Sequence, residues 1–193
     1  MENIKIRKAQ AGDAAALLAI YAPYVKETAI SFEYEVPTLD EFAQRMQKIQ
    51  KMYPYLVAEL DGKPVGYAYA GQFQARKAYA WDVEVTIYVD RGLRKSGIGR
   101  LLYETLERAL SAQGISNVNA CIAFPSGDRD DEFLTKNSVQ FHEHMGYRMV
   151  GRFTQCGYKF NRWYDMVWME KHIGAHAQNQ PPVVPFSEVD FKF

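Results

Sequence analysis

Hydrophobic and polar positions divide the chain into strand-like and helix-like segments. Residues 4–8 alternate apolar and charged side chains, which indicates a strand. An Ala- and Leu-rich helix is expected next, with Asp13 as its N-cap and Pro23 ending or bending it. Thr38 is followed three residues later by Glu41, a capping box that predicts the start of a second helix.

Three strands and a long helix are expected after these helices. Residues 55–73 read as two apolar strands around Asp61 and Gly62, which predicts a hairpin with a tight turn. Tyr79–Val89 predicts a third strand in the same run, and residues 97–113 have helical periodicity. The apolar face of that helix is expected to contain Ile98, Leu101, Leu102, Thr105, Leu106, Ala109 and Leu110.

The remaining segments complete an α+β pattern. A strand is expected at 116–124, a short helix at 137–147, and two strands at 148–153 and 163–170. This order predicts a mixed, mostly antiparallel central sheet of about seven strands, flanked by about four helices. The segment 174–193 contains "NQPPVVPF" and is expected to be an extended, Pro-rich surface tail, which leaves 1–173 as the folded domain.

Composition restricts the classes of partner. With 193 residues, 48% of them hydrophobic and 24% charged, the chain is expected to form one soluble globular domain. The 23 basic and 23 acidic residues cancel, so no net field favours nucleic acid or a membrane, and an anionic ligand needs a local site. The two cysteines have no metal-ligand spacing, and "MENIKIRKAQ" lacks the apolar core of a secretion signal; a cytoplasmic location is expected.

Two glycines one residue apart lie among basic side chains in "RGLRKSGIGRLL", residues 91–102. Such glycines are typical of phosphate sites. A Walker loop needs Lys and then Ser or Thr, where this chain has Ile98 and Gly99. A dinucleotide fingerprint needs a third glycine, where Leu102 stands, and an early βαβ unit, whereas this motif follows an antiparallel run in mid-chain.

The pattern that remains is Arg94-x-x-Gly97-x-Gly99. Glycine lets the backbone approach an oxyanion closely, and N–H groups at a helix start attract negative charge. The amides from Lys95 to Arg100 can therefore cradle a diphosphate. From the residues alone, a Gly-containing turn with solvated basic side chains is an equally good interpretation.

In its context this pattern resembles the pyrophosphate loop of the GNAT superfamily of acetyl-CoA-dependent N-acyltransferases. It follows the strand "VEVTIYVD", and "NSVQFHEHMGYRMVG" is similar to the family's second signature. The likeness extends over about residues 4–172. Three further segments, "YAPYVKETAISFEYEVPTLDEF", "GYAYAGQFQARKAYAWDVEVTIYV" and "GYKFNRWYDMVWMEK", resemble the phosphinothricin and methionine sulfoximine N-acetyltransferases, which acetylate the α-amine of compact, amino-acid-like substrates.

Acetyl transfer to an amine needs a group that accepts the ammonium proton. Glu84 lies in "WDVEVTIYV", where Asp82 and Thr86 share its strand face. The pattern alone favours a solvent-facing charge. The resemblance instead implies an active-site carboxylate, whose pKa would be raised if it is buried, acting directly or through water.

His142, in "FHEHMGY", is the second candidate for a catalytic role. The resemblance implies that it protonates the departing coenzyme A sulfur, which an imidazole can do near neutral pH. The alternative is a surface histidine, as we expect His144 to be. The two histidines with one adjacent Glu lack a third convincing ligand, so no metal site is expected.

The resemblance also implies where acetyl-CoA binds. Its pantetheine arm should pair, like an extra strand, with the exposed backbone of residues 87–89 and should contact Asn137, which is otherwise an N-cap candidate. Ser96 departs from the Gly or Arg common in the family, but that position mainly contributes its backbone N–H. The expected cofactor-binding residues are Ile87, Tyr88, Val89, Arg94, Lys95, Ser96, Gly97, Ile98, Gly99, Arg100 and Asn137.

The pocket for the acceptor is expected to combine one cation with several aromatic rings. Arg76 is a natural bidentate partner for a substrate carboxylate. The alternative is that these rings pack in the core, which is the more common position of aromatic residues in strands. Tyr158 and Lys159 are expected to close the pocket, in the same chain or across a homodimer interface. The expected acceptor-binding residues are Phe32, Glu33, Arg76, Tyr79, Trp81, Tyr158 and Lys159.

Three functions remain open at this point. The first is an acetyl-CoA-dependent N-acetyltransferase acting on a small amino-acid-like amine by direct transfer in a ternary complex. The second is the same fold acting on another amine, such as a peptide N-terminus or a polyamine. The third is an acyl-CoA-binding domain without turnover, which the presence of Glu84, His142, Gly97 and Gly99 disfavours.

Overall fold

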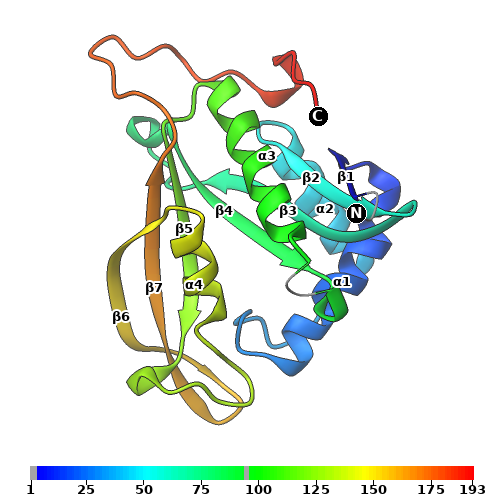
Figure 1. Cartoon of the computed structure of the whole chain (residues 1–193), viewed down its shortest axis with the longest axis vertical. Coiled ribbons are helices and arrows are strands. Elements are labelled where there is room, and N and C mark those ends of the chain that lie inside the picture. The colour runs from blue at the N-terminus through cyan, green and yellow to red at the C-terminus, as the bar shows by residue number, and fades with distance from the viewer. Residues whose placement is uncertain (1–3, 94–95) are drawn as a thin grey trace.

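Seven β-strands and four α-helices make up the regular structure of the residues that this computed structural model describes, 4–93 and 96–193 (Figure 1). The strands are β1 (Ile4–Lys8), β2 (Tyr55–Leu60), β3 (Lys63–Gln72), β4 (Asp82–Val89), β5 (Asn117–Phe124), β6 (Arg148–Lys159) and β7 (Arg162–His172). The helices are α1 (Ala14–Glu27), α2 (Leu39–Gln50), α3 (Ile98–Gln113) and α4 (Asn137–His144). This confirms the predicted α+β class and the order of its elements.

All seven strands belong to one sheet, in the order β1-β2-β3-β4-β5-β7-β6. Every neighbouring pair is antiparallel except β4 and β5, which are parallel. The β4–β5 pair is also the shortest: it joins Asp82, Val83 and Glu84 to residues 117–119 and then stops, although both strands continue. The sheet is therefore split between β4 and β5 over most of their length.

Helices cover the two faces of the sheet unequally (Figure 1). Side chains alternate between faces along a strand. On β3, Ala68 packs in a cluster with Leu102 and Leu106 of α3, whereas the adjacent Tyr67 packs in a second cluster with α1 and α2. The helices α3 and α4 thus lie on one face and α1 and α2 on the other, where they cover only the β2–β3–β4 side.

Helix α3 begins and ends at glycines in the left-handed region. Gly97, its N-cap, has φ +83°, and Gly114, its C-cap, has φ +91°. Its predicted apolar face is confirmed with one exception, because Leu101 is 36% exposed. Tyr103 is buried instead and joins the core of the α3 face.

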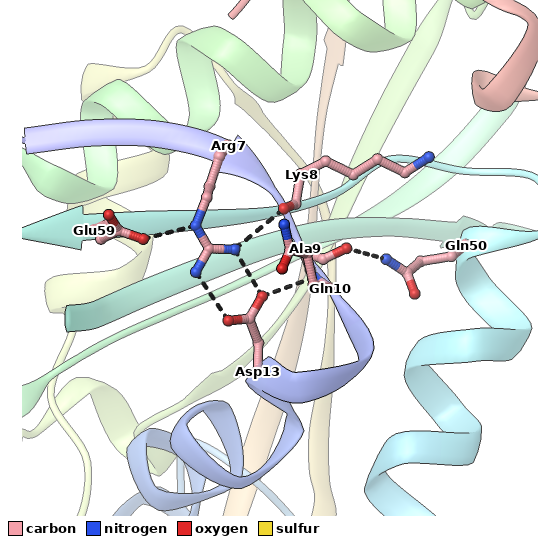
Figure 2. A network of polar contacts seen from close by, with 7 residues as sticks. All are labelled: Arg7, Lys8, Ala9, Gln10, Asp13, Gln50 and Glu59. Carbon is pink, nitrogen blue, oxygen red and sulfur yellow. Dashed lines mark hydrogen bonds and ion pairs between the residues drawn. The ribbon is translucent and has the colours of Figure 1, made fainter. Parts of the chain in front are cut away.

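The N-terminal strand is tied to the start of α1 by a charged network (Figure 2). Asp13 stands at the N-cap position, but its side chain does not cap the helix. Its carboxylate instead accepts bonds from the Arg7 guanidinium at 2.7 and 2.9 Å and from the Gln10 N–H at 2.7 Å. The Arg7 guanidinium lowers the pKa of Asp13, and Arg7 also donates to Glu59 on β2. The capping box of Thr38 and Glu41 at α2 is present as predicted.

Several predicted boundaries differ from the observed ones, and the short helix ends at His144 instead of Tyr147. Pro23, expected to end or bend α1, does not end it: the helix continues to Glu27, and Tyr24 and Val25 after the proline are buried. The third strand begins at Asp82, since residues 77–79 form a 3-10 turn. The predicted strand 148–153 extends to Lys159, with register shifts that let it follow β7.

The segment after Gly174 is extended, and several of its groups bind the main body. Phe186 is buried, and the side-chain amide of Gln113 donates to the Val184 carbonyl at 2.8 Å. These contacts fix the tail beside α3. The division of the chain into 1–173 and 174–193 stays a prediction. None of the helices among the described residues has the length and hydrophobicity needed to cross a bilayer.

Candidate active site

A cavity of about 260 Å³ occupies the split between β4 and β5. Because the two strands stop pairing after Glu84, the cavity passes between them and is lined from both faces of the sheet. Glu84 and Thr86 line it on the α1 side, whereas Tyr103 and His142 line it on the side of α3 and α4. The irregularity of the sheet thus creates a slot that brings acid–base groups from opposite faces together.

Glu84 projects from β4 into this slot. Its side chain has no hydrogen bond or ion pair with any described residue, and burial raises the pKa of its carboxyl above the usual value. The neighbouring Asp82 differs, because it accepts a bond from Asn119 Nδ2 at 2.5 Å and does not line the cavity. Burial raises the pKa of Asp82 to about 6. Of the two carboxylates, Glu84 is the one free to accept a proton from a ligand.

His142 lies on α4 and is only 3% exposed. Its Nδ1 is 2.7 Å from the Ser138 carbonyl oxygen, and its Nε2 is 3.0 Å from the Tyr103 hydroxyl. Because a carbonyl only accepts, Nδ1 carries the proton, and Nε2 accepts from Tyr103. Burial lowers the pKa of His142 to about 4. The imidazole is therefore neutral near pH 7 and holds the Tyr103 hydroxyl in the wall of the slot.

This burial predicts a pH-dependent stability. The unfolded chain protonates His142 near pH 6.5 and the folded chain only near pH 4. The unfolded state therefore binds more protons between these values, and stability attributable to His142 is present above pH 6.5 and lost as the pH falls toward 4. We expect a loss of about 3 kcal/mol across that window. Urea unfolding at pH 4.5–7 measures the free energy of unfolding across this window. His142→Gln should lack the part of the pH-dependent loss that comes from His142. His144→Gln, on the exposed side of α4, should behave as wild type. Equal pH slopes in all three proteins would contradict the burial of a neutral imidazole.

At the start of α3, three backbone N–H groups have no partner among the described residues. The first helical bond runs from the Leu101 N–H to the Gly97 carbonyl at 3.1 Å. The N–H groups of Ile98, Gly99 and Arg100 therefore have no partner within the described chain. Gly97 turns the chain with its positive φ, and a Cβ on Gly99 would lie 3.3 Å from the ring of Phe141. These features fit a site for an anion at the positive end of the helix dipole.

The side chains around these amides have different roles. Ile98 is buried in the core, so only its backbone faces the site. The Ser96 hydroxyl donates to the Leu93 carbonyl at 2.6 Å. Arg100 is exposed and pairs with Glu104 at 2.6 Å, one turn further along α3. Arg94 and Lys95, the other predicted basic residues, lie outside the described residues.

The free edge of β4 leads from the anion site to the slot. Residues 85–89 pair with β3, but among the described residues no strand pairs with them on the β5 side, and Ile87 and Tyr88 line the cavity. Such an edge can accept an extended, amide-rich ligand as an added strand. Val89 is less suitable than predicted, because its carbonyl already accepts a bond from the Tyr24 hydroxyl at 2.5 Å. Asn137 is exposed at the first turn of α4; Lys136, not Asn137, is the N-cap.

One of the predicted acceptor residues lies in the cavity wall, and two others lie in the β3–β4 connection. Phe32 lines the cavity directly. Tyr79 contacts Phe73, with ring centroids 6.0 Å apart, and Phe73 contacts Trp168 of β7 at 5.4 Å. Arg76 is exposed in the same β3–β4 connection, and its guanidinium has no partner among the described residues. The rings of Phe73, Tyr79 and Trp168 form an aromatic rim beside the cavity, because Trp168 pairs across the sheet with the lining residue Cys121.

Other predicted acceptor residues lie elsewhere. Glu33 pairs with Arg45 at 2.6 Å and lines a second cavity of about 140 Å³ beneath α2. The Trp81 indole N–H donates to the Pro181 carbonyl of the tail, at 2.6 Å. The Tyr158 ring is 44% exposed and packs on Trp163.

The prediction that Lys159 closes the acceptor pocket is the one that the structure corrects most clearly. Lys159 is 3% exposed, and its ammonium group donates to three backbone carbonyls, so no N–H remains for a ligand.

Two residues that the sequence interpretation missed belong to this region. Tyr103 lies among the apolar positions of α3, where its ring is indistinguishable from a core residue. Trp168 alternates with buried residues along β7, and only the sheet order places it next to Cys121. The alternation along β7 could have identified the face of Trp168, but not its neighbour.

Comparisons with known proteins agree with this geometry. Residues 6–168 match the family described as "Acetyltransferase (GNAT) domain". The phosphinothricin N-acetyltransferase of Streptomyces viridochromogenes is 34% identical over 186 residues, covering 96% of both chains. The L-methionine sulfoximine/L-methionine sulfone acetyltransferase of Pseudomonas aeruginosa is 31% identical, covering 89% of this chain and 95% of the relative.

Solved structures show the same fold. The crystal structure of a GNAT superfamily phosphinothricin acetyltransferase from Sinorhizobium meliloti, in complex with AcCoA, superposes with a TM-score of 0.82. It is 28% identical and covers 95% of this chain and 98% of its own. The family match over most of the chain, together with the split sheet and the unpaired amides of α3, leads to one conclusion: this chain is a member of the GNAT family of acetyltransferases.

Proposed function

We propose that this protein transfers the acetyl group of acetyl-CoA to the α-amine of a small amino-acid-like substrate, of the phosphinothricin, methionine sulfoximine or methionine sulfone type. The observation that carries the proposal is the slot between β4 and β5. It joins the first amides of α3, which have no partner in the described part of the chain, through a free strand edge to the carboxylate of Glu84. The residues present thus fit acetyl-CoA, with the diphosphate at α3 and the thioester in the slot.

The proton balance assigns a role to Glu84. An ammonium group cannot attack a carbonyl, so one proton passes from the acceptor to the Glu84 carboxylate, directly or through one water. The nitrogen then forms a bond to the thioester carbon as the carbon–sulfur bond breaks. The nitrogen loses a second proton, the departing thiolate gains one, and one proton is released to solvent per acetylation.

Tyr103 is the better candidate for the proton donor to sulfur. The predicted donor, His142, is neutral and has its only proton bound to the Ser138 carbonyl. Tyr103 lines the slot, and its hydroxyl, bonded to Nε2 in this structure, can turn toward the departing sulfur and give up its proton, whereas the Nδ1 proton of His142 is directed into α4. We therefore assign proton donation to Tyr103 and its orientation to His142.

Transfer proceeds directly and not through an acetylated cysteine. Cys121 is the thiol in the cavity wall. Although the residue is exposed, desolvation of its sulfur in the cavity wall and the nearby Glu84 raise its thiol pKa to about 12, so the thiolate that a nucleophile needs is scarce at neutral pH. Both substrates must then be bound together in a ternary complex.

Two features support an amino-acid-like acceptor. The unpaired guanidinium of Arg76 is suited to a substrate carboxylate. The aromatic rim of Phe73, Tyr79 and Trp168 is suited to a compact side chain. Relatives named for phosphinothricin and methionine sulfoximine cover nearly the whole chain.

A panel of amines tests this function. The protein is incubated with acetyl-CoA and each amine, thiol release is followed, and the product is identified by mass spectrometry. We expect N-acetylation of methionine sulfone, methionine sulfoximine or phosphinothricin, and none without an amine. Acetylation of peptides or polyamines alone would contradict the proposed acceptor, and acetyl-CoA binding without any product would contradict the proposed activity.

We also propose that the chain forms a homodimer through β6. This strand is an edge of the sheet, and Met149, Val150 and Phe153 are 46%, 57% and 57% exposed. A long unpaired edge with exposed apolar side chains promotes uncontrolled association unless it is covered. A second copy is the simplest cover.

The dimer predicts a specific effect of charge on this edge. Phe153→Asp should yield a monomer in sedimentation velocity, whereas the wild type sediments as a dimer. Leu39→Asp, at an exposed apolar residue of α2, is the control and should stay dimeric. A monomeric wild type, or an unchanged Phe153→Asp dimer, would contradict the proposed interface.

The proposed setting is the cytoplasm. Cys121 and Cys156 are free thiols, which supports a reducing compartment. The formal net charge of zero supports a small-molecule partner over nucleic acid.

A further inference from the structure

The connection between α1 and α2 forms the acceptor-side wall of the slot. Ile30, Ser31 and Phe32 line the cavity, yet they belong to a loop without regular structure. Something outside the loop must therefore fix its position. Apart from polar contacts with Tyr21, Arg45 and Phe133, its contacts converge on three consecutive residues near the end of β6.

Lys159 is the first of these contacts. Its Nζ donates to the carbonyls of Val25, Thr28 and Ser31 at 2.8, 2.9 and 2.6 Å. Val25 lies in the last turn of α1, where carbonyls lack helical partners and the helix dipole favours a cation. One buried ammonium thus joins the end of α1 to the start of the cavity wall.

Gly157 is the second contact. A Cβ at this position would lie 2.3 and 2.5 Å from two carbons of the Phe32 ring, far inside van der Waals contact. The ring therefore rests on bare backbone, close to Tyr164, whose ring centroid is 6.5 Å away. Between the two, the Tyr158 carbonyl accepts a hydrogen bond from the Tyr34 hydroxyl.

We infer that Gly157 and Lys159 position the Phe32 wall and thereby determine which acceptor side chains fit the slot. Both are positioning residues: neither lines the cavity, and they act through Phe32. The inference rests on the proposed function. Because Tyr103, His142 and the α3 amides make no contact with Lys159 among the described residues, acceptor and cofactor binding should respond differently to its loss.

Lys159→Met tests the ammonium contact. Methionine keeps the unbranched chain as far as Cε and removes the ammonium group with all three of its donors. We expect KM for the acceptor to rise about tenfold or more, with the acetyl-CoA dissociation constant within about twofold of wild type. Amide hydrogen exchange in residues 28–34 should accelerate, because the loop opens more often. Lys26→Met, at an exposed lysine in the same helical turn, is the matched control and should leave both quantities unchanged.

Gly157→Ala tests the same wall without removing a charge. The added methyl group displaces the Phe32 ring, so the acceptor KM should again rise and the order of preference among acceptors should change. In the double variant Gly157→Ala/Phe32→Ala the ring is absent and the methyl group has nothing to displace. The double variant should therefore match Phe32→Ala alone, a strongly non-additive result.

The outcomes separate the inference from the proposed function. No transfer by the wild-type protein to any amine would contradict both. Wild-type transfer with an unchanged acceptor KM in Lys159→Met and Gly157→Ala would contradict the inference alone. Additive effects of Gly157→Ala and Phe32→Ala would also contradict it, since Gly157 would then act independently of the ring.

Discussion

Glu84→Gln is expected to lower kcat/KM for the acceptor by about 10²- to 10³-fold at neutral pH, the usual contribution of a general base. Glutamine has nearly the same shape but cannot take the ammonium proton. Glu84 is not part of the anion site at the start of α3, so the acetyl-CoA dissociation constant of the variant should stay within about twofold of wild type. Calorimetry with acetyl-CoA and steady-state kinetics with methionine sulfone measure the two quantities.

The loss of activity in Glu84→Gln should depend on pH. Wild-type activity requires the ionised carboxylate and falls as the pH drops through the pKa of Glu84, which burial places above the usual value. As the pH rises, more acceptor reaches the variant as free amine, so the deficit of Glu84→Gln should shrink. Asp82→Asn, on the same strand face but outside the cavity, is the control and should lose less than about fivefold. A weakened acetyl-CoA affinity in Glu84→Gln would instead indicate a structural role.

Gly97→Val is expected to raise the acetyl-CoA dissociation constant by about 100-fold or more, equivalent to losing roughly 3 kcal/mol of binding. The residue has φ +83°, which a β-branched side chain strongly disfavours. To relieve this strain the turn must change, and with it the direction of the first amides of α3. The acceptor site near Glu84 is not touched by the change, so calorimetry with acetyl-CoA is the direct measurement.

Gly114→Val provides a matched control at the other end of the same helix. Gly114 has φ +91°, and a Cβ there meets only ordinary contacts at 3.7 Å or more. Both variants should lose about 1–2 kcal/mol of unfolding free energy from backbone strain. Only Gly97→Val should lose acetyl-CoA. Equal loss of binding in both would mean that general destabilisation, and not the anion site, is responsible.

Local patterns predicted the fold well because each pattern has a local cause. The capping box of Thr38, the turn at Asp61 and Gly62, and the glycines that bound α3 all act within a few residues. The alternation along β4 likewise placed Glu84 on the face of Thr86 and opposite Val85, although the solvent-facing charge that it favoured is a half-buried group in the cavity wall. These features need no knowledge of distant parts of the chain.

The predictions failed where a distant segment decides the outcome. Lys159 is buried because carbonyls from α1, more than 100 residues earlier, surround it. Trp81 is bound by the tail, and Tyr103 becomes part of the slot only because α4 places His142 beside it. None of these relations has a signal in residue spacing. For the same reason Pro23 does not end α1, since packing of the flanking side chains outweighs a lost hydrogen bond.

A crystal structure of the protein with acetyl-CoA is the measurement that tests the account most directly. We expect the diphosphate on the N–H groups of Ile98, Gly99 and Arg100, the pantetheine along the free edge of β4, and the acetyl group in the slot between Glu84 and Tyr103. A thioester bound on the outer face of the sheet, or a diphosphate that makes no contact with these amides, would contradict the assignment of this slot as the site of acetyl transfer.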